Sequence, residues 1–227
     1  MNLIGEHTDY NGGLALPFAI AQGVTVRAER RGAEVVVGQA PGAEAFVRGA
    51  AAELRAAGVA VGGAGLRVES DLPQGAGLAS SAALTVAVAL ALLGLAGEEM
   101  DRMALARLCS RVENQWAGAR TGLLDQIASL FGEEGHALLV DFATLERRPV
   151  PLALGEWRLV LLDSGERRAL GDGRYDERRA ECERGDERRL RHVHGENARV
   201  RAAVAALDAG DVAALGPLLD ASHASLR

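Results

Sequence analysis

The sequence of 227 residues predicts an α+β fold. Segments typical of strands and longer segments with helical spacing follow one another without a regular strand–helix alternation, which disfavours a doubly wound parallel sheet. Hydrophobic residues make up 48% of the chain, enough for a substantial core. The length allows one large domain or two modest ones.

The individual elements follow from periodicity and turn residues. Strands are predicted where β-branched or alternating apolar residues lie between glycines and charged turns, and helices where apolar residues recur every three to four positions. The predicted extended segments are 14–20, 24–28, 35–38, 66–70, 137–140 and 159–162. The predicted helices are 44–57, 82–96, 100–116, a charged helix from 175 onwards, and 212–219. Residues 148–151 hold two prolines and are predicted to connect two lobes, 1–155 and 156–227.

Composition excludes several classes of function. All 25 basic residues are arginine, so no lysine is present for a Schiff base or for the phosphate loop of Walker-type kinases. The net charge of −6 gives no basic footprint for nucleic acid. The apolar stretch 82–96 is shorter than the ~20 residues that span a bilayer. No signal peptide precedes the first strand, and Cys109 and Cys182 lack zinc-ligand spacing, so we expect a cytoplasmic protein with reduced thiols and no membrane partner.

A glycine- and serine-rich loop joins a predicted strand to a predicted helix. Its glycines allow backbone N–H groups to approach a phosphate, the helix N-terminus adds a positive dipole, and its serines could cap the helix or reach Mg²⁺. A simple Gly-rich turn with a Ser cap is the alternative. A dinucleotide-binding reading, with Gly75 and Gly77 as the first glycines and Glu98 as the acidic residue, is disfavoured because Ser80 replaces the third glycine and a helix precedes Glu98. The loop residues considered for phosphate binding are Gly75, Ala76, Gly77, Leu78, Ala79, Ser80 and Ser81.

Several polar residues elsewhere are candidates for chemistry. The opening loop holds Glu6, His7 and Asp9, which could bind vicinal hydroxyl groups of a sugar or form a solvated turn. Asp125 lies where a helix could begin, so it could simply oppose the helix dipole. His192 and His194 resemble a metal pair on paper, but a charged helix would point them apart.

Four ordered motifs carry a family resemblance. Residues 73–83 resemble the second motif of the GHMP small-molecule kinases, and residues 2–13 resemble the signature of the galactokinases within that family. Residues 122–126, and Tyr175 with residues 178–183, are further matches. The resemblance implies a two-lobed GHMP kinase fold, with a mixed α/β sugar- and ATP-binding lobe over 1–155 that lacks its first strand, and a partial ferredoxin-like lobe over 156–227.

The resemblance also implies an activity and residue roles. The expected reaction is ATP-dependent phosphorylation of the C1 hydroxyl of galactose by a monomeric enzyme. Asp125 would accept or orient the proton of that hydroxyl, and Ser81 with Glu113 would hold Mg²⁺. Residues 75–81 would bind ATP. The residues implied to bind galactose are Glu6, His7, Thr8, Asp9 and Tyr175.

Two alternatives remain open at this point. A related GHMP kinase could act on another sugar, such as an N-acetylhexosamine or arabinose, or the chain could be a non-catalytic sensor of galactose and ATP or an inert fragment. Family members carry Arg-Val before the residue matching Asn2, and a Gly-rich third motif near the C-terminus that this sequence lacks. We therefore expect an incomplete form in which Met1 is a misassigned start within a longer reading frame, with little or no activity.

Overall fold

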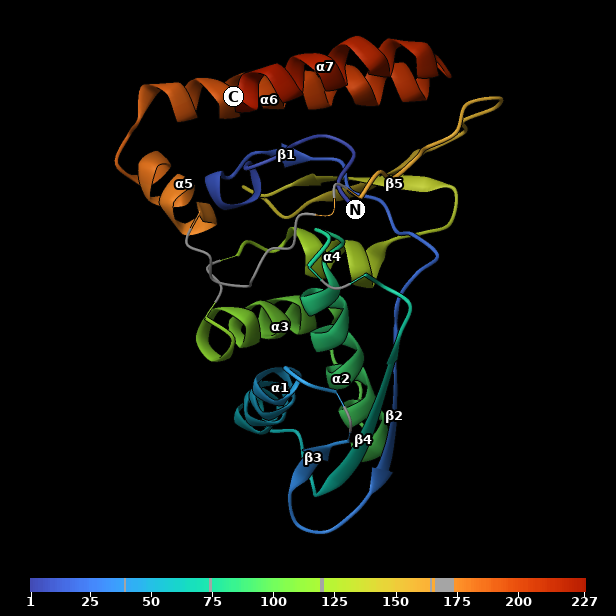
Figure 1. The fold of residues 1–227 in the computed structure, drawn as a ribbon, viewed down its shortest axis with the longest axis vertical. Helices are drawn as coiled ribbons and strands as arrows, with labels where there is room; N and C mark the ends of the chain where they lie inside the picture. Colours follow the sequence, from blue (N-terminus) through green and yellow to red (C-terminus); the bar gives the residue numbers. More distant parts are fainter. Residues whose placement is uncertain (39, 74, 119–120, 164, 166–173) are drawn as a thin grey trace. The chain divides into compact units, whose positions relative to one another are not determined.

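The computed structural model describes residues 1–38, 40–73, 75–118, 121–163, 165 and 174–227. The chain forms two compact units (Figure 1). Unit 1 comprises Met1–Ala19, Phe131–Asp163 and Gly173–Arg227, and unit 2 comprises Ile20–Leu130 and Ser164–Asp172. These units divide the chain at other points than the predicted boundary after residue 155, because the N-terminal segment shares a core with the C-terminal helices.

Unit 2 contains a three-stranded sheet and a group of helices. Strand β4 (Ala64–Ser70) lies in the centre of the sheet, antiparallel to β2 (Val24–Arg30) and parallel to β3 (Val35–Val37). The helices are α1 (Glu44–Ala56), α2 (Ser80–Ala96), α3 (Arg102–Trp116) and α4 (Leu124–Phe131). Helix α3 begins two residues later than predicted because the carboxylate of Asp101 caps it, accepting from the amides of Met103 and Ala104.

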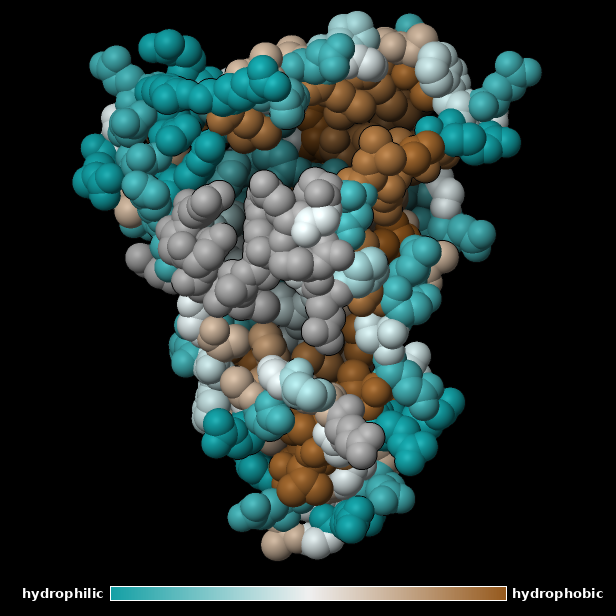
Figure 2. Space-filling view, in the orientation of Figure 1, coloured by the Kyte–Doolittle hydropathy of each residue, from teal (hydrophilic) through white to brown (hydrophobic). Residues whose placement is uncertain are grey.

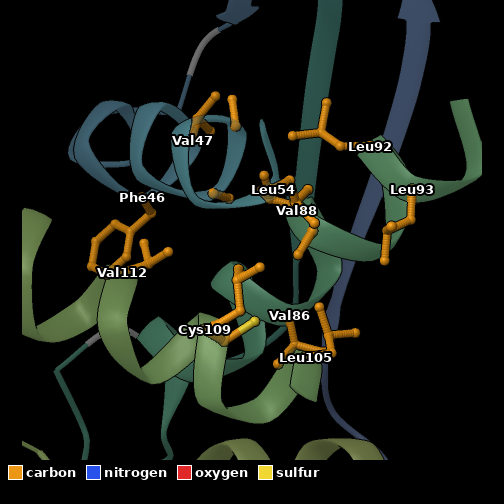
Figure 3. Close-up of a cluster of buried hydrophobic side chains, with 14 of the residues drawn as sticks. Phe46, Val47, Leu54, Val86, Val88, Leu92, Leu93, Leu105, Cys109 and Val112 are labelled. Carbon is orange, nitrogen blue, oxygen red and sulfur yellow. The ribbon is translucent and has the colours of Figure 1, made fainter. Parts of the chain in front are cut away.

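The core of unit 2 lies where α1, α2 and α3 meet (Figure 3). Leu54, Val88 and Leu105 are almost completely buried there, and Cys109 lies among them. Gly49 allows α1 to approach α3, since a Cβ atom at this position would lie 2.7 Å from Cγ of Trp116. Helix α2 is apolar on nearly every side because it packs between the sheet and both other helices.

Unit 1 is built on an antiparallel sheet in the order β1-β5-β6, formed by Leu14–Ala15, His136–Asp141 and Arg147–Pro151. Ile4, Leu16 and Val150 form a core with Val200 and Val204 of the long helix α6 (Glu187–Asp208). The remaining elements of the unit are η1 (Asp9–Asn11), α5 (Arg174–Glu183), α6 (Glu187–Asp208), η2 (Val212–Ala214) and α7 (Leu215–Leu226).

Two predictions for the middle of the chain were wrong. Residues 148–151, predicted as a connection, belong to strand β6, which pairs only with β5 in the described sheet and therefore tolerates its prolines at an edge. Residues 159–162, predicted as a strand, form none, because no described strand lies beside them to share main-chain hydrogen bonds. Their side chains are exposed, with Leu162 at 91%, and Figure 2 shows hydrophobic surface along this segment.

The helical C-terminal region is divided more finely than predicted. The charged helix from residue 175 breaks at Gly185, which has a φ of +81°, and α6 then begins after its cap residue Asp186. The predicted helix 212–219 is a 3₁₀ turn followed by α7, whose first turn accommodates Pro217. Among the described residues, no helix combines the length and apolar character that crossing a membrane requires.

Candidate active site

The opening polar loop of unit 1 is held in shape by its own backbone. Gly5 has a φ of +106°, and a Cβ atom there would lie 2.5 Å from Cα of Ala15, so only glycine fits. The hydroxyl of Thr8 lies 2.7 Å from the carbonyl oxygen of Gly5 and 2.8 Å from that of Leu14, which closes the two ends of the loop. The Thr8 side chain is completely buried by these contacts, whereas Glu6 is exposed.

Two of the predicted sugar-binding residues, distant in sequence, meet in unit 1. The phenol of Tyr175 donates a hydrogen bond to Oδ1 of Asp9 over 3.1 Å. The ring of Tyr175 also lies 5.5 Å from the ring of His7, measured between centroids. The structure therefore brings Asp9, His7 and Tyr175 together on one side of the loop, with Glu6 next in the chain.

Tyr10 completes this cluster, and sequence reasoning assigned it no role although it lies within the quoted opening motif. Its hydroxyl is 2.8 Å from Nδ1 of His7, and its ring packs edge-on against Tyr175. Burial, followed by the nearby Cys182 and Asp9, raises the pKa of Tyr10 well above its ordinary value. A phenol that keeps its proton can donate to Nδ1 of His7, which places the ring proton of neutral histidine on Nε2.

The phosphate-loop candidate of unit 2 leads into helix α2. Gly75, Gly77 and Ala79 all have positive φ values, between +54° and +75°, so alternate residues turn the backbone. The predicted serine cap is wrong: Ala79 occupies the cap position with no side-chain hydrogen bond, and Ser80 is the first helical residue. The side chain of Ala79 therefore leaves the first backbone amides of α2 uncapped. An anion-binding site needs such uncapped amides.

A buried carboxylate lies close to this loop in the same unit. Glu113 on α3 is only 2% exposed, and its Oε2 accepts hydrogen bonds from the Thr121 hydroxyl and the Gln126 amide, each 2.9 Å long. Burial raises the pKa of Glu113, contacts with Thr121, Ser81 and Gln126 partly offset this, and the charge of Asp125 adds to it. Ser81, Glu113 and Asp125 are thus neighbours, and burial raises the pKa of Asp125 as well.

The donor set around Glu113 fits a magnesium ion. Oε1 of Glu113 and Oε1 of Gln126 are buried and form no hydrogen bond within the described residues. With the Ser81 hydroxyl, they present the oxygen atoms that Mg²⁺ prefers. In the described ranges no three His, Cys, Asp or Glu side chains group as a metal site. Thr121 and Gln126 escaped the sequence analysis, although Gln126 closes the quoted motif 122–126.

The histidines considered as metal ligands are not paired. His192 is buried and hydrogen bonded through both ring nitrogens, whereas His194 on the same helix is exposed.

Comparison with protein families matches two parts of the chain. Residues 45–133 match the GHMP kinases N terminal domain. Residues 1–30 match the galactokinase galactose-binding signature. The first match contains the phosphate loop, Glu113 and Asp125, and the second contains the polar opening loop.

Full-length relatives give the same assignment. A galactokinase of Halalkalibacterium halodurans is 37% identical over 279 residues, covering 100% of this chain and 71% of the relative. One of Mycobacterium tuberculosis is 39% identical, covering 100% of this chain and 76% of the relative. The crystal structure of Lactococcus lactis galactokinase complexed with galactose matches 99% of this chain and 72% of its own, with a TM-score of 0.91 and 32% identity.

Proposed function

Because the chain belongs to the galactokinase family of the GHMP kinases, we propose that it transfers the γ-phosphoryl group of ATP to the C1 hydroxyl of galactose. The observation that carries this proposal is that a galactose-binding signature and a GHMP kinase domain occur in one chain whose whole length aligns with galactokinases. The name of the galactose-bound neighbour supports galactose as the sugar.

In this proposal unit 1 recognises the sugar. Asp9 and Tyr175, which are hydrogen bonded to each other, and His7 beside them supply donors and acceptors that match sugar hydroxyls. Glu6 is exposed, and its carboxylate, which accepts a hydrogen bond from Asn2, is proposed to contact the sugar as well. The side chain of Thr8 is buried, so we propose that Thr8 shapes the loop and contributes no side-chain contact to galactose.

Unit 2 would bind the nucleotide. Without a lysine, the phosphates are bound by backbone amides of residues 75–81 and by the N-terminal dipole of α2. Ser81 and Glu113 would hold Mg²⁺, with the Gln126 oxygen close by. When bound, the ion would neutralise charge on the phosphate oxygens.

The proposed chemical step is an in-line displacement. The C1 oxygen of galactose forms a bond to the γ-phosphorus, the bond from that phosphorus to the bridging oxygen breaks, and ADP leaves. Asp125 accepts or orients the hydroxyl proton. Burial raises the pKa of Asp125, and phosphoryl transfer depends more on positioning than on a strong base.

The cellular setting follows the family in our proposal. We propose a monomer in the cytoplasm, where Cys109 and Cys182 remain reduced; both are unpaired and buried.

A substrate panel tests the proposed function directly. ADP release is measured by a coupled assay with galactose, N-acetylgalactosamine, arabinose and no sugar, each with Mg²⁺ and with EDTA, and galactose binding is measured by calorimetry. We expect Mg²⁺-dependent release with galactose above the other sugars, at the low rate expected of an incomplete chain. Preferred turnover of another sugar would contradict the assignment to galactose. Galactose binding without turnover would favour a sensor.

A further inference from the structure

One face of helix α6 binds the backbone of the polar opening loop in unit 1. Nε2 of His192 lies 3.0 Å from the carbonyl oxygen of Glu6, a contact in which the ring donates. Oε1 of Glu196 accepts the amide of Gly5 over 3.0 Å. Oδ1 of Asn197 accepts the amide of Leu14 over 2.8 Å. His192 and Glu196 are four residues apart and lie one turn apart on the same side of α6, and Asn197 lies about 100° further around the helix axis.

The contacts hold both ends of the loop. Gly5 and Glu6 begin the segment that carries the candidate sugar-binding residues, and Leu14 follows its last residue. Oδ1 of Asn197 also lies 2.6 Å from where a Cβ atom of residue 13 would be, so this approach requires Gly13. Rigid attachment at two ends fixes the direction of the side chains between them.

Side chains of helix α7 hold His192 and Glu196 in place. The hydroxyl of Ser225 lies 2.9 Å from Nδ1 of His192, and that of Ser222 donates to Oε1 of Glu196 over 2.6 Å. Arg199 donates to Oε2 of Glu196 and neutralises its buried charge. Both nitrogens of the His192 ring are thereby engaged, which leaves it neither a free metal ligand nor a free base.

We infer that His192, Glu196 and Asn197 are positioning residues for galactose recognition. This inference rests on the proposed function, since it concerns the loop proposed to bind the sugar. Each of the three residues contacts main-chain atoms of that loop, and their effect on galactose is transmitted through the placement of Glu6, His7 and Asp9. A site that pairs each sugar hydroxyl with a fixed partner loses affinity when its partners shift, because the buried groups are left unpaired.

A matched pair of variants at Asn197 isolates the anchoring acceptor. Asn197→Leu keeps the size of the side chain and removes the oxygen, whereas Asn197→Asp keeps an oxygen at the same place. We expect Asn197→Leu to raise the Kd for galactose about tenfold, the effect of losing one hydrogen bond, with Asn197→Asp within about threefold of the unchanged protein. Calorimetry measures Kd and stoichiometry separately. A smaller folded fraction would lower the stoichiometry and would leave the Kd for galactose unchanged. The Kd for ATP should change less than twofold.

A second pair tests the same role through a different residue. His192→Phe removes the donor to Glu6, and His192→Gln retains an N–H group at about the same reach; only the former should weaken galactose binding. Hydrogen exchange of the peptide covering residues 5–14 should quicken in Asn197→Leu and in His192→Phe. Unchanged galactose Kd in both damaging variants, with normal binding by the unchanged protein, would overturn the inference. An unchanged protein that binds no galactose would instead overturn the proposed function, while the exchange rates would still decide whether α6 anchors the loop.

Discussion

At the scale of single residues, Glu113 is a buried carboxylate whose surroundings disfavour its charged form. It is nearly inaccessible to water, one of its oxygens forms no hydrogen bond within the described residues, and the charge of Asp125 lies near it. Burying an ionised carboxylate costs free energy unless its partners compensate fully. Thr121, Ser81 and Gln126 compensate only in part, and Oε1 of Glu113 forms no hydrogen bond within the described residues.

Glu113→Gln should therefore stabilise unit 2 at neutral pH while weakening nucleotide binding. The substitution removes the buried charge and keeps an oxygen to accept from Thr121 and Gln126. We expect the melting temperature to rise by a few degrees, on the scale of about 2–4 °C per kcal/mol for a chain of this size. Calorimetric titration should show at least about tenfold weaker binding of ATP with Mg²⁺ and little change without the metal. A lower melting temperature at neutral pH would contradict this interpretation of Glu113.

Asp125→Asn tests the residue assigned to the transferred proton. The amide has nearly the same shape but cannot accept a proton, so kcat should fall by about 10²-fold or more. The Kd for galactose, measured by calorimetry, should remain within about threefold. A variant with unchanged kcat would refute the role given to Asp125, and one with strongly weakened galactose binding would point to recognition instead.

The sequence singled out the charged members of the site better than their neutral partners. Asp9, Asp125 and Tyr175 belong to recognisable motifs, and the family resemblance singled out Glu113 from its place on the helix before Asp125. The structure places Asp9 with Tyr175 in unit 1 and Glu113 near Asp125 in unit 2. Thr121 and Gln126 donate to Glu113 across 8 and 13 positions of the chain, contacts that no local pattern encodes. The buried position of Thr8 depends on two carbonyl groups brought together by the folded loop, so it too was not predictable.

At the scale of elements, the opening loop depends on a glycine that no other residue can replace. Gly5→Ala would combine a strained φ with a clash against the backbone of Ala15. Gly210→Ala is the matched control in unit 1, because Gly210 also has a positive φ, +73°, but open space around it. We expect Gly5→Ala to lower the free energy of unfolding of unit 1 by at least about 2 kcal/mol more than Gly210→Ala. Thermal melts would measure the difference, and equal losses would show that backbone strain alone matters.

Element prediction succeeded where local signals agreed and failed where pairing decided. Periodicity located α1 and α3 closely, and alternation located β4, because the apolar face of each is set within the element itself. Strand β6 contains two prolines that argue against a strand, yet an edge position accommodates them. Residues 159–162 have the composition of a strand, but no described strand pairs with them. Composition alone does not show whether a pairing strand is present.

At the scale of the whole molecule, the two units should respond to acid with opposite sign. The raised pKa of Glu113, caused by burial, means that its folded form takes up a proton more readily, so unit 2 gains stability as the pH falls towards the unfolded pKa of about 4.3. Burial alone would raise the pKa of Glu196, but hydrogen bonds from Ser222, Gly5 and Arg199 outweigh it and lower the pKa. The stability due to Glu196 is complete above the unfolded pKa of about 4.3 and is lost as pH falls through its folded pKa.

Hydrogen exchange of core peptides from each unit, corrected for the intrinsic pH dependence, measures this response. As the pH falls from 7 towards the unfolded pKa of about 4.3, the peptides of unit 2 should become better protected, and this gain should be smaller in Glu113→Gln, where only Asp125 still contributes. Below about pH 4 the peptides of unit 1 should lose protection, and Glu196→Gln should flatten that loss. A loss of protection in unit 2 on mild acidification would contradict the sign expected from Glu113.

The positions of the two cysteines have a practical consequence for following the molecule. Cys109 lies in the core of unit 2 and Cys182 lies buried in unit 1, so each unit carries one natural thiol probe. Burial raises the pKa of Cys109 to about 12, so the reactive thiolate is scarce while unit 2 stays folded. The alkylation rate at each sulfur therefore reports how often its own unit opens. Mass spectrometry of a single sample would show whether galactose slows alkylation in one unit and ATP slows it in the other.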